Sequence, residues 1–253
     1  MKKILAFVAI VAMVFGAASC KKDDKGGKEK KEKKEYVAPI KIDGDFSDWA
    51  KLDASKVSTA TCDPEATKTA LKTVKVYADE VFIYVYFEWD KDQISYSPGE
   101  DGESVPFHCY VNGDGNASTG GFSSQWSDAC SDALLEGHIY PDGVLGSYDP
   151  AVYKWWGDPN GDGWKWSEVE GEDMPILAAG SGICKGAGIE GKYEFYITRE
   201  LYPLGKIADT FSIGFDIQQN WDTVGFLPNG HVDETVEGST GLVPSLKVVT
   251  VKE

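Results

Sequence analysis

The chain has 253 residues with 25 basic and 41 acidic side chains, a net charge of −16. Residues 1–35 hold ten of the lysines and five of the acids, so residues 36–253 carry a net charge of −21. Such an acidic surface repels phosphate backbones and argues against nucleic acid as a partner, while the remaining length suits a single β-sandwich or barrel with a sizeable core.

The N-terminus has the layout of an export signal. Lys2 and Lys3 precede an apolar run of twelve residues, Ile4–Phe15, and small residues follow at positions 16–19. This run is too short to cross a bilayer core of about 30 Å, which takes roughly 20 helical residues. Residues 1–19 are therefore predicted to be a cleavable signal peptide.

The segment Ala17-Ala18-Ser19-Cys20 resembles the lipobox of bacterial lipoproteins, in which the cysteine is acylated. The resemblance implies lipid on Cys20 and attachment to a membrane; an ordinary secretory signal is the alternative. Residues 20–36 are predicted to be a solvated tether, because positions 21–35 contain no apolar side chain. Lys22-Asp23-Asp24 resembles the signal that directs lipoproteins of Bacteroidota to the outer face of the outer membrane, which implies exposure at the cell surface.

Residues 37–253 are predicted to form one β-sandwich domain. Leu71–Tyr77 and Val81–Trp89 read as strands joined by a tight turn at Asp79-Glu80. The second strand is apolar or aromatic on both faces, which predicts a central position in its sheet. Alternating apolar residues predict four later strands, at Phe107–Val111, Tyr193–Ile197, Phe211–Ile217 and Leu246–Thr250. Many short strands separated by long Gly- and Asp-rich loops indicate an all-β, antiparallel sandwich.

Three stretches together resemble the family 9 carbohydrate-binding module. They are Ile40–Leu52 with its I-D-G-x(3)-D-W motif, the strand pair within Leu71–Asp90, and Phe107–Tyr140 with its Asn-Gly-Asp-Gly-Asn loop. The wider DOMON-like superfamily of jelly-roll sandwiches shares this layout. The resemblance implies a jelly-roll fold, a site for sugars or other small ligands at one side of the sandwich, and structural calcium.

The opening motif is interpreted as mainly structural. Asp43-Gly44 predicts a turn in which Gly44 adopts a positive φ. Asp48 is expected to cap a short helical turn. Trp49 is expected to plug one end of the core.

The strongest local feature is the aromatic segment YKWWGDPNGDGWKW, residues 153–166. It predicts a hairpin with two aromatic arms, whose candidate glycan-binding rings are Tyr153, Trp155, Trp156, Trp164 and Trp166. Indole faces pack on the C–H patches of sugars, so such a cluster suits a glycan site. The alternatives are cross-strand packing that stabilises the hairpin, or a patch through which an assembly lipoprotein contacts another outer-membrane protein.

Two oxygen-rich loops are candidates for structural Ca²⁺. The first contains Asp158, Asn160 and Asp162 before a glycine, which is half of a calcium-loop pattern without the glutamate at its twelfth position. The second contains Asn112, Asp114 and Asn116 at a strand end. Asp132 or Glu136 is spaced to close a cation site from a neighbouring strand. Plain Asx turns and solvated carboxylates are the alternatives.

Four cysteines remain if Cys20 carries lipid: Cys62, Cys109, Cys130 and Cys184. In an exported protein they allow two disulfides with three possible pairings. The three histidines are far apart in sequence and are expected to be surface or strand residues. No sequence motif of a hydrolase nucleophile, a zinc protease or a P-loop occurs, so the sequence favours a binding protein over an enzyme, although the 36 acids leave room for a glycosidase carboxylate pair.

Overall fold

The computed structural model describes residues 36–94, 105–122, 125–128, 130–139, 151–168, 185–189, 191–201, 205–220, 222–231, 235 and 241–252. Cys20, the predicted signal peptide and the predicted tether up to residue 35 lie outside these residues, as does Cys184. The chain divides into two units, Met1–Val37 and Ala38–Glu253, and the second is described below. In the described part of the chain, no helix is both long enough and apolar enough to span a bilayer.

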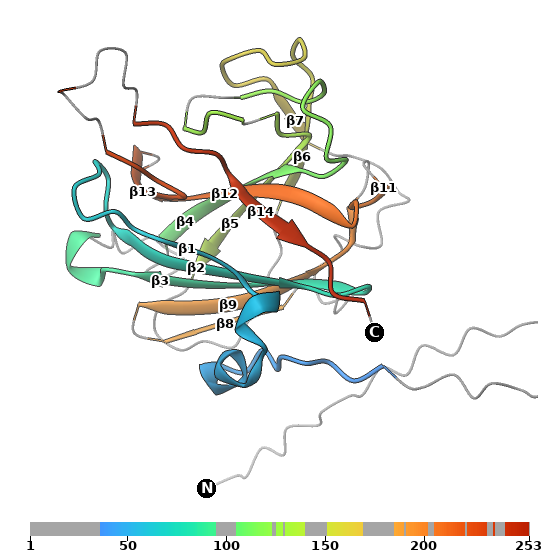
Figure 1. Ribbon diagram of the computed structural model, residues 1–253. Helices are drawn as coiled ribbons and strands as arrows, with labels where there is room; N and C mark the ends of the chain where they lie inside the picture. Colours follow the sequence, from blue (N-terminus) through green and yellow to red (C-terminus); the bar gives the residue numbers. More distant parts are fainter. Residues whose placement is uncertain are drawn as a thin grey trace, which may run out of the picture. The chain divides into compact units, whose positions relative to one another are not determined.

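The alternating strands of the Ala38–Glu253 unit pair into two facing antiparallel sheets (Figure 1). The smaller sheet has the order β1 (Ser58–Thr61), β2 (Leu71–Ala78), β3 (Phe82–Trp89), β9 (Lys192–Thr198) and β8 (Lys185–Ile189). The larger sheet has the order β13 (Asp222–Leu227), β12 (Thr210–Gln219), β4 (Val105–Asn112), β5 (Ala133–Ile139), β6 (Ala151–Trp155) and β7 (Trp166–Glu168), and β14 (Leu246–Val249) also pairs with β12. Two short strands, β10 (Glu200–Leu201) and β11 (Gly205–Lys206), pair separately. The predicted all-β antiparallel sandwich is confirmed, whereas the jelly-roll connectivity stays a prediction.

The main core lies between the inner faces of the two sheets. At its centre Phe87 of β3 makes edge-to-face contacts with Phe107, Phe195 and Phe215, at ring-centroid distances of 5.4–5.6 Å. All four rings are fully buried, and burial of such a side chain contributes about 1.5–3 kcal/mol. β3 occupies the middle of its sheet and buries both faces, as its sequence predicts.

The opening motif packs against the outer face of the smaller sheet. Trp49, in the 3₁₀ helix η1 (Phe46–Lys51), lies 5.8 Å from the ring of Tyr86 on β3. It is buried, but in a separate apolar cluster rather than at the end of the main core. The predicted helix cap was also wrong: Asp45 caps η1 by accepting from the amide of Ser47, while Asp48 accepts from the amide of Lys41. A second 3₁₀ helix, η2 (Ala54–Lys56), follows, and η3 (Lys91–Gln93) follows β3.

One buried carboxylate attaches this segment to the sheet. Glu194 of β9 accepts from the Trp49 indole at 2.9 Å and from the amides of Asp43 and Gly44 at 3.2 and 3.1 Å. Gly44 adopts a φ of 82°, which confirms the predicted turn. Burial raises the pKa of Glu194 although the three donors oppose the shift. The turn and the indole therefore share a single acceptor.

Replacing Glu194 by alanine should leave three donors without their acceptor, and one of them, the Trp49 indole, is buried. We expect a loss in the free energy of unfolding on the order of 3 kcal/mol, measured by urea denaturation. Glu80→Ala, at the exposed β2–β3 turn, is the matched control and should cause no measurable loss. Equal effects of the two substitutions would contradict the assigned role of Glu194.

Candidate functional site

β6 and β7 form the predicted aromatic hairpin, with Trp155 opposite Trp166. Its rings differ in exposure: Trp155 is 7% exposed, Tyr153 and Trp166 are half-buried, and Trp164 and Trp156 are 52% and 67% exposed. Of the five candidate rings, Trp155 is therefore not available to a ligand, because its side chain is buried.

Trp155 instead supports the two loops that flank it. A Cβ atom at Gly121 or Gly157 would lie 2.3 or 2.4 Å from the indole, so both positions require glycine. The indole Nε1 donates to the carbonyl of Asp158 at 3.1 Å. Backbone hydrogen bonds of 2.8 Å also join the loops directly, from Asn160 to Gly120 and from Phe122 to Gly161. The loops at residues 113–122 and 156–165 are thus one connected unit beside the outer face of the larger sheet.

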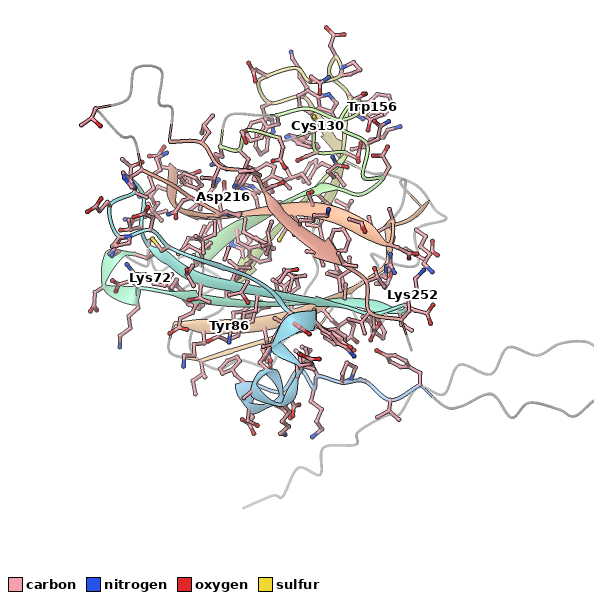
Figure 2. The ribbon with its side chains drawn as sticks, viewed as in Figure 1. Lys72, Tyr86, Cys130, Trp156, Asp216 and Lys252 are labelled. Atoms are coloured by element: carbon pink, nitrogen blue, oxygen red, sulfur yellow. The ribbon has the colours of Figure 1, made fainter. Side chains whose placement is uncertain are left out.

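Three charged side chains lie opposite one another on that outer face. Asp216 of β12 is the strand partner of His108 on β4, and His108 is the partner of Glu136 on β5. The His108 Nδ1 lies 2.9 Å from Asp216 Oδ1, and its Nε2 lies 2.9 Å from Glu136 Oε2. The side chains of His108 and Asp216 are 2% and 1% exposed, and that of Glu136 is 22% exposed. We call Asp216, His108 and Glu136 the charged row. It reaches solvent at its Glu136 end, and its buried end is Asp216, which is labelled in Figure 2.

The hydrogen bonds fix the protonation state of the charged row. Burial disfavours a charge on His108, but the bonds to Asp216 and Glu136 outweigh it and raise the pKa of His108 to about 9. The bond from His108 in turn lowers the pKa of Glu136. At neutral pH the row is therefore an imidazolium between two carboxylates, with one net negative charge.

Polar neighbours donate hydrogen bonds to both carboxylates of the charged row. Asp216 Oδ2 accepts from Tyr110, Thr223 and Gln125, at 3.3, 3.2 and 3.4 Å. Glu136 Oε1 accepts from the Tyr153 hydroxyl at 3.4 Å. Three buried polar atoms beside them, Gln125 Oε1, Trp166 Nε1 and Oε1 of Gln218, whose Nε2 lies 3.0 Å from His108 Nδ1, have no hydrogen-bond partner among the described residues. Such atoms are uncommon in folded proteins and mark positions where a water or ligand completes the bonding.

Aromatic rings stand beside the charged row. Trp164 lies edge-on to His108 at 5.6 Å and to Phe122 at 5.7 Å. Phe122 stacks on Tyr110 at 5.0 Å. Because Trp164 is half exposed, it places an open indole next to His108, the imidazole that is bonded to the partly exposed Glu136. We call the charged row together with Gln125, Tyr153, Trp164 and Trp166 the polar-aromatic site.

Trp156 does not belong to this site. Its ring lies 5.2 Å from Lys154 Nζ, and Lys154 alternates with Tyr153 and Trp155 along β6. Trp156 thus faces away from the charged row.

The two candidate calcium loops differ in how their oxygens are occupied. In the loop of Asp158, Asn160 and Asp162, all three residues are exposed and the Asn160 side chain accepts from the Cys130 thiol at 2.8 Å. Asn160 also adopts a φ of 58°. These features are those of a turn rather than of a converging ligand set.

The second loop has more oxygen atoms that are available to a cation. Asn112 is 9% exposed and its Oδ1 has no partner among the described residues. Asp132 immediately precedes β5 and accepts from the amide of Gly113 at 2.9 Å, and burial and nearby Asp114 raise its pKa. Asn116 accepts from the amide of Ser118 in an Asx turn. Across the described ranges, no three or more His, Cys, Asp or Glu side chains gather as a metal-ion group.

The predicted pair of disulfides is not formed. Cys62, Cys109 and Cys130 are free thiols, and two disulfides among four cysteines would need a bond between at least two of these three. Cys109 points into the main core and is fully buried, which raises the pKa of its thiol. It is therefore a core residue.

Sequence reasoning placed His108 on a strand but missed its partners. A signal was present: His108 interrupts the apolar run of β4, and Asp216 and Gln218 interrupt that of β12, each at alternate positions that face outward. Two strands with charged residues on one face indicate a polar site on that face. What the sequence did not reveal is that these strands are neighbours.

No protein-family profile matches the chain, and no curated protein matches it significantly.

Titration by NMR should separate His108 from His138. We expect the His108 imidazole to titrate near 9, above its ordinary value of 6.5, and His138 below that value because burial lowers its pKa.

The same shift links stability to pH. Because the pKa of His108 is higher in the folded state than in the unfolded chain, its contribution is complete below pH 6.5 and is lost as pH rises through 9. The loss should be on the order of 3 kcal/mol in the free energy of unfolding. A His108 titration at or below 6.5 would contradict the imidazolium assignment.

Proposed function

We propose that this protein is a lipid-anchored surface lipoprotein that binds glycan at the polar-aromatic site. The observation that carries the proposal is the half-exposed Trp164 indole against His108, whose Nε2 is bonded to the partly exposed Glu136. A sugar ring packs its C–H face on an indole while its hydroxyls bond to polar neighbours. Gln125 Oε1 and Trp166 Nε1 supply an acceptor and a donor whose bonds are not otherwise satisfied.

The remaining parts of the proposal rest on the N-terminal sequence and on the resemblance to family 9 carbohydrate-binding modules. The lipobox-like segment before Cys20 supports acylation and membrane attachment. Lys22-Asp23-Asp24 supports export to the outer face of the outer membrane. The antiparallel sandwich agrees with the fold expected of such a module, and fold by itself does not specify a ligand.

Binding is proposed rather than catalysis because of how the carboxylates are used. A glycosidase needs two carboxyl groups that both reach the scissile bond. Here Asp216 is 1% exposed and already accepts four hydrogen bonds, including one from His108. Of the two carboxylates in the charged row, Glu136 is the one that a ligand can reach.

Trp156 supports a second candidate function. This 67% exposed indole lies away from the charged row and has the character of a hot spot for a protein contact. An assembly role with another outer-membrane protein would use this ring and would require no sugar.

We also propose that Ca²⁺ binds the loop that contains Asn112 and Asp114, and that Asp132, just before β5, completes the site. Support comes from the buried, unpartnered Asn112 Oδ1 and from the proximity of two carboxylates. Oxygen donors of this kind are those that Ca²⁺ prefers.

Trp164→Ala should reduce affinity for a bound polysaccharide by about five- to thirtyfold, because stacking on an indole contributes about 1–2 kcal/mol. Trp156→Ala is the matched control and should bind like the parent in affinity gels. If only Trp156→Ala weakens binding, or if no saccharide is retained while an outer-membrane protein is, the second candidate function replaces the first.

Addition of Ca²⁺ should raise the melting temperature of the parent, and a chelator should reverse the rise, because a ligand that binds only the folded state stabilises it. Asp132→Asn should abolish the response. Asp162→Asn, in the other loop, should retain it. A melting temperature that does not respond to either reagent would overturn the calcium proposal.

A further inference from the structure

The polar-aromatic site is asymmetric in charge and in free bonding capacity. Its cation, the His108 imidazolium, is buried and uses both N–H groups on carboxylates. None of the described lysines or arginines forms an ion pair with Glu136 or Asp216. A ligand that reaches the site therefore meets the negative end of the charged row first.

Most of the hydrogen-bonding capacity that remains in the polar-aromatic site belongs to acceptors. Each oxygen of Glu136 accepts one hydrogen bond, from His108 or from Tyr153, and a carboxylate oxygen accepts two. At the Asp216 end of the row, Gln125 donates through Nε2 to Asp216 and Thr223, which leaves its buried Oε1 as an acceptor without a partner among the described residues. Trp166 Nε1 is the one unpartnered donor beside them. A matching ligand must supply more donors than acceptors.

From this asymmetry we infer that Glu136 determines ligand specificity and that the site selects saccharides rich in hydroxyl or amine donors, and rejects uronic acids and sulfated sugars. The inference rests on the proposed glycan-binding function. An acidic sugar would place a carboxylate or sulfate next to Glu136. The hydrogen bond from His108 keeps Glu136 negatively charged. Two like charges at about 4–6 Å repel by a few kcal/mol near a protein surface, so rejection should amount to at least about tenfold in affinity.

His108 acts here as a positioning residue. Its hydrogen bond fixes the orientation of the Glu136 carboxylate and keeps it ionised, because the bond lowers the pKa of Glu136. When Glu136 is made neutral, the imidazolium is left with one carboxylate and the row carries no net charge. The discrimination against acidic sugars should then disappear.

The experiment compares oligosaccharides that share a backbone and differ in charge. One set is cello-oligosaccharide, chitosan oligosaccharide and β-1,4-linked oligoglucuronate, and a second set is galacto-oligosaccharide, galactosamine oligosaccharide and oligogalacturonate. Affinities are measured by calorimetry for the parent, for Glu136→Gln and for Glu80→Gln. Glu80→Gln makes the same change in net charge at the exposed turn of the other sheet.

We expect the parent and Glu80→Gln to bind the uncharged or amine-bearing member of a set at least about tenfold more tightly than the acidic member. Glu136→Gln should bring this ratio close to one. The two accepted classes are separated by salt: the amine-bearing sugar should lose affinity as salt is raised, and the uncharged sugar should not. Equal ratios in Glu136→Gln and the parent, or preference of the parent for the acidic member, would overturn the inference and leave the glycan-binding function intact.

A measurement on the parent alone protects the test against a Glu136→Gln variant that does not fold. Salt screens repulsion, so the affinity for the acidic member should rise between low and high salt. A fall in that affinity with salt would overturn the inference. Absence of binding to every member of both sets would overturn the glycan-binding function, and this inference with it.

Discussion

Asp216, His108 and Glu136 are ionised groups on three neighbouring strands, and two of them have almost no contact with water. An isolated buried ion costs several kcal/mol, so this row is stable only if each charge is paired and the remaining oxygens are hydrogen-bonded. The mutual pairing through both imidazole nitrogens meets the first condition, and Tyr110, Thr223 and Gln125 meet much of the second. The outer face of the larger sheet is therefore arranged around this row.

The same requirement explains the cover over that face. Trp126 is fully buried against Tyr110 and donates from its indole to the carbonyl of Pro228. The Phe122 ring also stacks on Tyr110, and the Trp164 ring packs edge-on against His108. These rings exclude water from the imidazolium and leave the carboxylate of Glu136 as the accessible end. Structure and proposed recognition thus depend on one arrangement of charges.

Much of the sandwich could be predicted because strand periodicity is a local property. The runs around Phe87, Phe107 and Phe215 alternate clearly, and each became a strand of the core. β5 was missed because its sequence, Ala133–Ile139, contains two consecutive leucines that serve opposite faces and a glycine that weakens the pattern. The opening motif was predicted to be structural, but its acceptor, Glu194, is 145 residues away from Trp49 and no local pattern indicates it.

The site could be predicted only in part, for a related reason. Residue type identified the aromatic hairpin, yet exposure depends on what packs against each ring, and Trp155 is buried by glycines from two loops. His108 and Asp216 are 108 residues apart and meet through sheet order, which hydrophobic pattern does not determine. Periodicity predicts which face a residue occupies, whereas the choice of neighbouring strand is a property of the whole fold.

The indole of Trp155, seated against Gly121 and Gly157, separates the framework of the loops from their variable positions. Since backbone contacts and one ring hold the loop shape, exposed side chains such as those of Ser118, Asp158 and Lys165 contribute surface chemistry without setting the path of the chain. A combinatorial library that randomises these three positions and keeps the ring and its two glycines would therefore sample new recognition properties on an unchanged scaffold. Transplanting the loops to another sandwich would require that the ring and both glycines travel with them.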